Sequence, residues 1–245
     1  MIGWEKWIAC LFDGPHTPRH QISVSRYTPR DVTIGHSSSL RLVDIEGFDG
    51  NTRLMTGELL VFNGPSSAGK STLIKELQQL WPRPLFATGI DSIFMGWAEK
   101  FFLDHVEADQ AREVHSLKIV SGLGPAPSWI PKLNDTFLTI SHHTHTSWHA
   151  MSQSGIDVAV DHCIFEPRIR EQAQTLLSGA FWIGVICDIE ELVRREAIRG
   201  DRYLGFASGS SAVVHDGVNY DMVIDTTVTP PEELARQVFD VVSGR

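Results

Sequence analysis

The chain has 245 residues, of which 42% are hydrophobic and 21% are charged, and its formal net charge is −9. This composition is typical of a globular protein, and no apolar run approaches the roughly 20 residues that a membrane-spanning helix needs. The acidic balance disfavours a general nucleic-acid binder, and three scattered cysteines (Cys10, Cys163 and Cys187) exclude a disulfide framework and a zinc site.

The first 55 residues form the first expected unit. They contain six basic and six acidic side chains, so the whole net charge belongs to residues 56–245. They have neither a helical period nor a clean alternation, and charged residues interrupt the first apolar stretch, unlike in a signal peptide. We expect residues 1–55 to be a poorly ordered N-terminal extension of a reduced, cytoplasmic protein.

Residues 56–245 have a different pattern and form the second expected unit. They contain five short apolar runs separated by helical patterns, at residues 58–63, 84–91, 156–161, 181–187 and 222–225. Such runs are typical of a parallel sheet that is covered by helices on both faces. The expected fold is therefore α/β, with a five-stranded parallel sheet in a three-layer arrangement.

A phosphate-binding motif follows the first apolar run. It has the spacing Gly, four residues, Gly-Lys-Ser/Thr, and a helical pattern follows it over residues 70–80. Its glycines let the backbone fold around a phosphate, so that N–H groups and the N-terminus of the next helix point at the anion. The predicted nucleotide-binding residues are Gly64, Pro65, Ser66, Ser67, Ala68, Gly69, Lys70, Ser71 and Thr72.

Two side chains of this motif have distinct predicted roles. Lys70 is expected to reach the β- and γ-phosphates and to act in catalysis, while the Ser71 hydroxyl binds the Mg²⁺ ion that accompanies the nucleotide. The motif itself specifies nucleotide binding and not a reaction. A guanine-reading Asn-Lys-x-Asp stretch does not occur in the sequence, which disfavours a GTPase. We therefore expect ATP and Mg²⁺ as cofactors.

Two carboxylates end predicted strands. Ligands of doubly wound sheets bind at the carboxyl ends of the strands, where Asp91 and Asp161 fall. Asp91 could accept the proton of a substrate hydroxyl, or it could cap the helix that follows it. Asp161 stands where an acid that orients magnesium is expected, although it could also be a simple strand-end cap. We expect Asp91 to be catalytic, and Ser71 and Asp161 to bind the metal.

Residues 92–155 separate these carboxylates and are expected to form the acceptor-binding insertion, mainly from helices. Aromatic side chains are frequent there, which suits an apolar pocket for a small alcohol but also fits ordinary helix packing. They are Phe94, Trp97, Phe101, Phe102, Trp129 and Trp148. His142, His145 and His149 share one predicted helical face. A metal site, substrate hydrogen bonding and plain surface histidines are the alternatives for them.

An arginine cluster follows the fourth apolar run. Arg195, Arg199 and Arg202 share one face if the helix continues, and like charges repel unless an anion lies among them. The alternative is a solvated helix with i, i+4 ion pairs, which leaves Arg199 and Arg202 unexplained. Those pairs are Glu190 with Arg194 and Glu191 with Arg195. We expect a phosphate-clamping lid over about residues 194–212, with Arg195 on the nucleotide and Arg199 and Arg202 in catalysis.

Several motifs together resemble the chloramphenicol phosphotransferase family over about residues 58–240. They lie at residues 62–72, 89–92, 158–161, 184–188, 195–202, 213–221 and 223–227. The resemblance implies an ATP-dependent O-phosphotransferase of the shikimate-kinase-like fold, with strand order 2-3-1-4-5. The family's proposed base, which accepts the proton of a primary hydroxyl, matches Asp91. The arginines that match Arg199 and Arg202 belong to the family's lid.

Two features depart from the family pattern. Residues 1–55 have no counterpart in it, and a second carboxylate can follow the third strand of the family, whereas His162 follows Asp161 here. The metal or proton role of this position is therefore open.

The sequence as a whole predicts a kinase that moves the γ-phosphate of ATP to a hydroxyl of a small molecule, such as an antibiotic or related natural product. The alternative is a regulatory or toxin-like nucleotide-binding protein, with a macromolecular acceptor or none. Asp91 favours the kinase, because a pure switch needs no base opposite the phosphate loop. The expected partner is a small-molecule acceptor, and neither nucleic acid nor a membrane is expected.

Overall fold

The computed structural model describes residues 56–96, 115–120, 128–199 and 204–245. The expected extension, residues 1–55, lies outside the described residues, as do Trp97, Phe101, Phe102 and Arg202. Among the helices in the described ranges, none is both long and apolar enough to cross a membrane.

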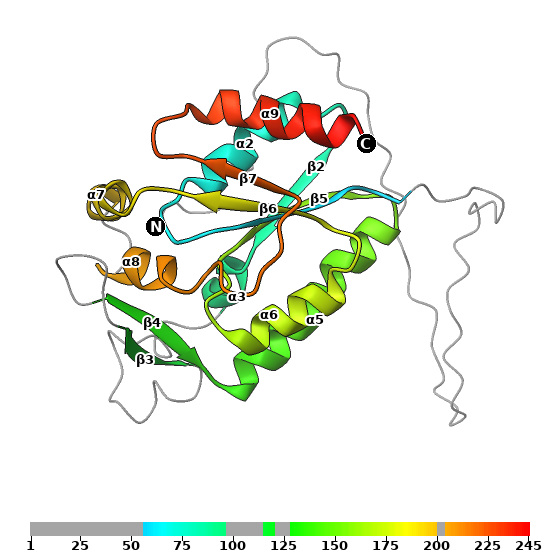
Figure 1. Cartoon of the computed structure of the whole chain (residues 1–245). Coiled ribbons are helices and arrows are strands. Elements are labelled where there is room, and N and C mark those ends of the chain that lie inside the picture. The colour runs from blue at the N-terminus through cyan, green and yellow to red at the C-terminus, as the bar shows by residue number, and fades with distance from the viewer. Residues whose placement is uncertain (1–55, 97–114, 121–127, 200–203) are drawn as a thin grey trace, which may run out of the picture. The chain divides into compact units, whose positions relative to one another are not determined.

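A parallel five-stranded sheet forms the centre of residues 56–245 (Figure 1). Its strands are β1 (Leu59–Asn63), β2 (Leu85–Gly89), β5 (Asp157–His162), β6 (Phe181–Ile186) and β7 (Met222–Asp225). They lie in the order β2-β5-β1-β6-β7. Counted along this sheet alone, the order is 2-3-1-4-5; the labels differ because β3 and β4 pair in a separate sheet. The expected α/β fold is confirmed.

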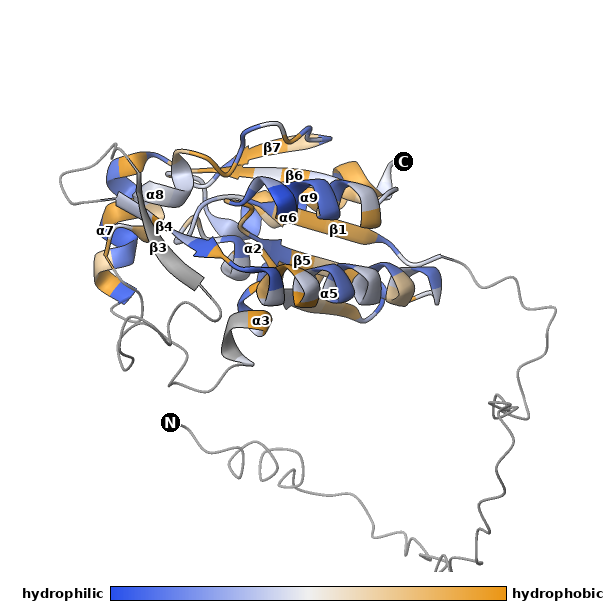
Figure 2. Ribbon diagram, turned by 90° about the horizontal axis from the view of Figure 1, so that it is seen from below, coloured by the Kyte–Doolittle hydropathy of each residue, from blue (hydrophilic) through white to orange (hydrophobic). Residues whose placement is uncertain are grey.

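Helices cover both faces of the sheet, with α2 (Lys70–Leu80) and α9 (Pro231–Ser243) on one face and α5 (Asp135–Gln153) and α6 (Pro167–Leu176) on the other (Figure 1). Side chains alternate along β1, so Leu60 and Phe62 pack in the core cluster of α2 and α9, while Leu59 and Val61 pack with Trp148 of α5. Figure 2 shows the hydrophobic strands between helices whose outer sides are polar.

Local signals explain where two of these helices begin. Pro231 occupies the first turn of α9 and is followed by Glu232 and Glu233, which suit the positive N-terminal end of a helix. The Asn134 side chain accepts a hydrogen bond of 3.0 Å from Phe137 N and so caps α5.

An antiparallel hairpin of β3 (His115–Val120) and β4 (Ser128–Leu133) was not expected in the insertion, where we predicted mainly helices. Its β4 strand contacts α8 (Phe206–Ser211): the rings of Trp129 and Phe206 stack with centroids 5.2 Å apart. A Cβ atom on Gly209 would lie 2.1 Å from the Trp129 carbonyl oxygen, so only glycine permits this approach. The hairpin thus rests on contacts that are distant in sequence.

Candidate active site

The phosphate-binding motif forms the turn between β1 and α2. Ser67 and Gly69 both have a positive φ, of 64° and 87°. A Cβ atom on Gly64 would lie 2.3 Å from a carbonyl oxygen of β6, so this position has room only for glycine. The loop surrounds its own lysine, because Lys70 Nζ donates to the carbonyl oxygens of Gly64 (3.0 Å) and Pro65 (2.8 Å).

The loop has the properties of an anion site. Lys70 is a cation with only 6% of its surface exposed, and it is the first residue of α2. The hydroxyls of Ser66 and Ser67 are buried without a hydrogen-bond partner in the described part of the chain. The backbone N–H of Ser66 donates to Ser210 Oγ of α8 at 3.1 Å. Unpartnered buried hydroxyls beside a buried cation fit a phosphate ligand.

Asp161 connects this loop to the neighbouring strand. Its Oδ2 accepts a hydrogen bond of 2.5 Å from Ser71 Oγ, and its Oδ1 lies 3.5 Å from Lys70 Nζ. Strand β5 pairs with both β1 and β2, which brings the carboxylate to the end of the phosphate loop. A hydroxyl and a carboxylate that is still 26% exposed are the hard oxygen ligands that Mg²⁺ prefers, so these residues fit the ion.

Asp91 lies near Asp161 at the same edge of the sheet. It is the first residue of the short helix α3 (Asp91–Met95), and the preceding Ile90 N donates to the Asp161 carbonyl oxygen at 3.1 Å. Burial raises the pKa of the Cys163 thiol to about 11; the charge of Lys70 opposes this shift, and the charges of Asp91 and Asp161 add to it. Lys70, Asp91 and Asp161 therefore all lie close enough to Cys163 for their charges to act on its thiol.

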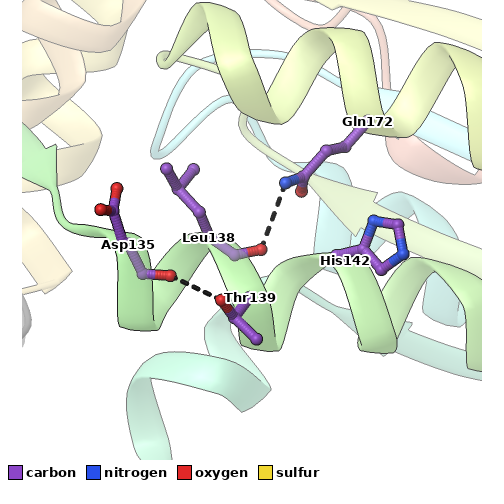
Figure 3. A pocket seen from close by; sticks show the side chains of 5 residues that line it. All are labelled: Asp135, Leu138, Thr139, His142 and Gln172. Carbon is purple, nitrogen blue, oxygen red and sulfur yellow. Dashed lines mark hydrogen bonds between the residues drawn. The ribbon is translucent and has the colours of Figure 1, made fainter.

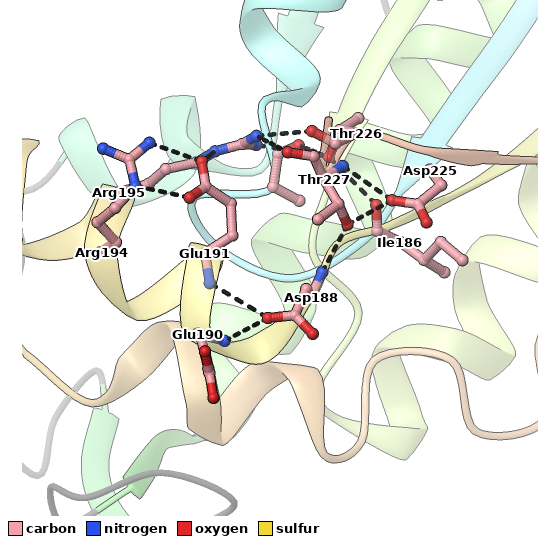
Figure 4. Close-up of polar contacts among 10 residues, drawn as sticks. Ile186, Asp188, Glu190, Glu191, Arg194, Arg195, Asp225, Thr226 and Thr227 are labelled. Atoms are coloured by element: carbon pink, nitrogen blue, oxygen red, sulfur yellow. Dashed lines mark hydrogen bonds and ion pairs between the residues drawn. The ribbon is translucent and has the colours of Figure 1, made fainter. Parts of the chain in front are cut away.

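The ion pairs of α7 (Ile189–Arg199) differ from the predicted pattern (Figure 4). Arg195 pairs with Glu191 as predicted, with Nε 2.6 Å from Oε1. Arg194 also pairs with Glu191, three residues away, at 2.6 Å, and not with Glu190. Hydrogen bonds from Arg194 and Arg195 lower the pKa of Glu191 to about 2. One carboxylate therefore holds both arginines.

Arg195 lies beside the phosphate loop. Its guanidinium donates to the Thr226 carbonyl oxygen at 2.6 Å, and the Thr226 hydroxyl donates to the Ala68 carbonyl oxygen at 2.7 Å. A Cβ atom on Gly69 would lie 3.4 Å from an Arg195 nitrogen. Arg199 is the last residue of α7 and is exposed, whereas Arg202 lies outside the described residues.

Glu196 is a residue that sequence reasoning missed. It is 1% exposed, and its two carboxylate oxygens accept hydrogen bonds from Gly205 N (2.8 Å) and Ala207 N (2.7 Å) at the start of α8. It thereby connects α7 to the helix that carries Ser210. Its spacing of four residues from the buried Leu192 could have indicated a buried position.

We expect Glu196→Ala to destabilise the fold by about 2–4 kcal/mol, because two buried N–H groups lose their acceptor. Glu196→Gln should lose less, since its amide oxygen still accepts one bond. The matched control, Glu190→Ala, removes an exposed acid of the same helix and should cost less than about 1 kcal/mol. Chemical denaturation measures all three, and equal losses for Glu196→Ala and Glu190→Ala would contradict this role.

The histidines of the insertion do not share one environment. His145 is fully buried and its Nε2 lies 2.9 Å from His162 Nε2, whereas His142 is exposed and its ring lies against His143. In the described ranges, no group of three or more His, Cys, Asp or Glu side chains could hold a metal ion. The metal interpretation of these histidines therefore has no support.

The described aromatic residues of the insertion pack against other elements. Trp148 is buried in the cluster that includes Val61 and Val158, and Trp129 stacks on Phe206. The side chain of Phe94 lies outside the described residues. The sequence allowed two interpretations of Trp129 and Trp148, an acceptor pocket or ordinary packing. The contacts of both side chains favour packing.

An open depression of about 360 Å³ lies between α5 and α6 (Figure 3). Its lining residues are Asp135, Leu138, Thr139, His142 and Gln172. The Gln172 side-chain amide donates to the Leu138 carbonyl oxygen at 3.2 Å. The Thr139 hydroxyl donates to the Asp135 carbonyl oxygen at 2.8 Å. Of the candidate residues only His142 lines it, and none of the predicted catalytic, nucleotide-binding or metal-binding residues does, so we assign it no function.

Comparison with known proteins identifies the family. The description "Chloramphenicol phosphotransferase-like protein" matches residues 57–243. Two proteins from two strains of Mycobacterium tuberculosis, each named as an inferred O-phosphotransferase, are 30% identical over 193 residues, which is 75% of this chain and 81% of theirs.

A solved structure supports the fold. The M. tuberculosis APS kinase CysC, in complex with AMPPNP and APS, has a TM-score of 0.50 and 15% identity, over 77% of this chain and 98% of that one. The chain belongs to the chloramphenicol phosphotransferase-like family and has the fold of a P-loop kinase.

Proposed function

We propose that this protein is an ATP-dependent O-phosphotransferase that transfers the γ-phosphate to a hydroxyl of a small molecule. The position of Asp161 carries the proposal: its carboxylate contacts Lys70 and Ser71, and its carbonyl oxygen holds the segment that begins at Asp91. A phosphate, a metal ion and a proton acceptor are thus expected in one small region. A nucleotide switch would need only the first two.

The nucleotide side of the reaction is proposed for residues 64–72. Their N–H groups and the charge of Lys70 bind the phosphates, and Ser71 and Asp161 hold Mg²⁺, which neutralises phosphate charge when bound. Arg195 supports a nucleotide site because it lies beside Gly69. Arg199 and Arg202 are proposed to add positive charge over the phosphates from the expected lid, residues 194–212. The APS kinase of similar fold binds AMPPNP, and we propose ATP here.

Asp91 is proposed as the base on the acceptor side. It takes the proton of the acceptor hydroxyl as that oxygen forms a bond to the γ-phosphorus. The bond from the γ-phosphorus to the bridging oxygen breaks, and ADP leaves with the electron pair. Lys70 holds the charge that develops on the phosphate oxygens. These roles are supported by the place of Lys70, Asp91 and Asp161 at the carboxyl edge of the sheet, where ligands of such sheets bind.

The acceptor is proposed to be a small alcohol that binds the insertion, residues 92–155. The family description and the O-phosphotransferase relatives support a hydroxyl acceptor. Hydroxylated antibiotics, with chloramphenicol among them, and related natural products are the class that we propose.

Transfer from γ-labelled ATP to a panel of hydroxylated antibiotics and metabolites tests this function. We expect label in at least one organic product, and none in the matched compound whose hydroxyl is methylated. Label that enters only a macromolecule would instead favour the regulatory or toxin-like alternative.

A further inference from the structure

Two buried histidines connect α5 to the end of strand β5. His162 is the last residue of β5, and His145 lies in α5; both are 0% exposed. Their Nε2 atoms are 2.9 Å apart. The backbone N–H of Cys163 donates to the other ring nitrogen of His162, Nδ1, at 3.0 Å. Both ring nitrogens of His162 therefore have a hydrogen-bond partner.

These contacts specify how the protons are arranged. A ring nitrogen that accepts a hydrogen bond carries no proton, so the hydrogen bonds alone assign the proton of each ring. Because His162 Nδ1 accepts from Cys163, the proton of His162 is on Nε2 and is donated to His145 Nε2. The proton of His145 is then on Nδ1, which has no partner among the described residues.

The backbone in front of this pair carries the proposed phosphate and metal site. The His162 carbonyl oxygen accepts from Gly64 N at the start of the phosphate loop (3.3 Å), and the Asp161 carbonyl oxygen accepts from Ile90 N (3.1 Å). Side chains alternate along a strand, so the Asp161 carboxylate points to Ser71 while the His162 ring points to α5 on the opposite face. The two residues are adjacent in β5, so a shift of the backbone at His162 would also move Asp161.

We propose that His145 is a positioning residue, which acts through the imidazole of His162 to hold the Asp161 carboxylate in place for Mg²⁺. This inference rests on the proposed function, because it assumes that Asp161 and Ser71 bind the ion. A second observation supports it: a buried N–H without an acceptor at His145 Nδ1 destabilises the fold. Phenylalanine would fill the space beside Trp148 and remove this donor, but it would leave the His162 Nε2 proton without an acceptor, so the histidine serves His162 and not only packing.

The variants His145→Phe and His145→Gln separate positioning from packing. Phenylalanine fills the space but cannot accept the His162 proton, whereas the glutamine side-chain oxygen can accept it at the position of Nε2. His145→Phe exchanges one unpartnered donor, His145 Nδ1, for another, His162 Nε2, so the melting temperature should change little. His143→Phe is the matched control, because His143 is exposed on the same helix.

Calorimetric ATP binding, with Mg²⁺ and with EDTA, measures the effect without an acceptor substrate. We expect His145→Phe to reduce the affinity gain from Mg²⁺ by at least about 10-fold, the scale for losing a hydrogen bond that orients a metal ligand, and to leave ATP affinity in EDTA unchanged. His145→Gln and His143→Phe should keep the wild-type gain. If Mg²⁺ raises the ATP affinity of His145→Phe as much as that of the wild type, the positioning role alone is overturned. If Mg²⁺ does not raise the ATP affinity of the wild type, the proposed magnesium site is overturned, and this inference with it.

Imidazole ¹⁵N spectra of the wild type provide a test that does not depend on how a variant folds. We expect the Nε2–H tautomer for His162 and the Nδ1–H tautomer for His145, with both sets of signals shifting when Mg²⁺ is added to the ATP complex. The opposite tautomers, or signals that do not respond to Mg²⁺, would overturn the inference.

Discussion

Lys70→Ala is expected to lower phosphoryl transfer by at least about 100-fold and to weaken ATP binding. Lys70 is the only cation in residues 64–72, and its ammonium is held by the Gly64 and Pro65 carbonyl oxygens at the centre of the loop. The charge of a bound γ-phosphate would therefore lose its nearest partner in the loop. Label transfer and calorimetric ATP binding measure the two effects.

Two variants control for the loss of charge and for the loss of a lysine in general. Lys70→Arg keeps a positive charge but presents a larger planar group to a site built for a compact ammonium, so we expect it to be impaired as well. Lys75→Ala removes an exposed lysine of the same helix and should behave as the wild type. Near-normal transfer by Lys70→Ala would mean that the nucleotide binds elsewhere.

Asp91→Asn is expected to lower transfer by roughly 100-fold or more with ATP affinity unchanged, the scale for losing a positioned base. Asparagine has almost the same shape and accepts the same backbone hydrogen bonds, but it cannot take a proton from the acceptor. If Asp91 only stabilises the start of α3, the asparagine would serve nearly as well.

The control for this substitution is Asp135→Asn. Asp135 is also the first residue of a helix, and it is exposed. Its loss of activity should be much smaller than that of Asp91→Asn, and calorimetric ATP binding reports whether each variant is folded. Wild-type turnover by Asp91→Asn would reject the base and direct attention to Asp161.

The sheet and the phosphate loop could be predicted from the sequence because their signals are local. The five apolar runs correspond to β1, β2, β5, β6 and β7 with boundary shifts of at most two residues. The motif spacing alone specified the loop between β1 and α2. The neighbouring positions of Asp161 and Ser71 depend on the strand order, which only the family resemblance implied; β5 lies next to β1 as that order requires.

The features that could not be predicted depend on contacts between distant segments. The hairpin of β3 and β4 packs through Trp129 on Phe206, 77 residues further along the chain. The His145 pair exists only because α5 packs on β5. Arg194 forms its ion pair with Glu191, three residues away, and not with Glu190, four residues away. Both spacings are within reach on a helix, so the sequence alone does not distinguish them.

Product analysis by ³¹P NMR tests the central claim most directly. Once an acceptor is found, the wild type with Mg²⁺ and ATP should form one phosphate monoester for each ADP, and Lys70→Ala should form neither above background. ADP with inorganic phosphate alone, at the same rate with and without the acceptor, would contradict an O-phosphotransferase.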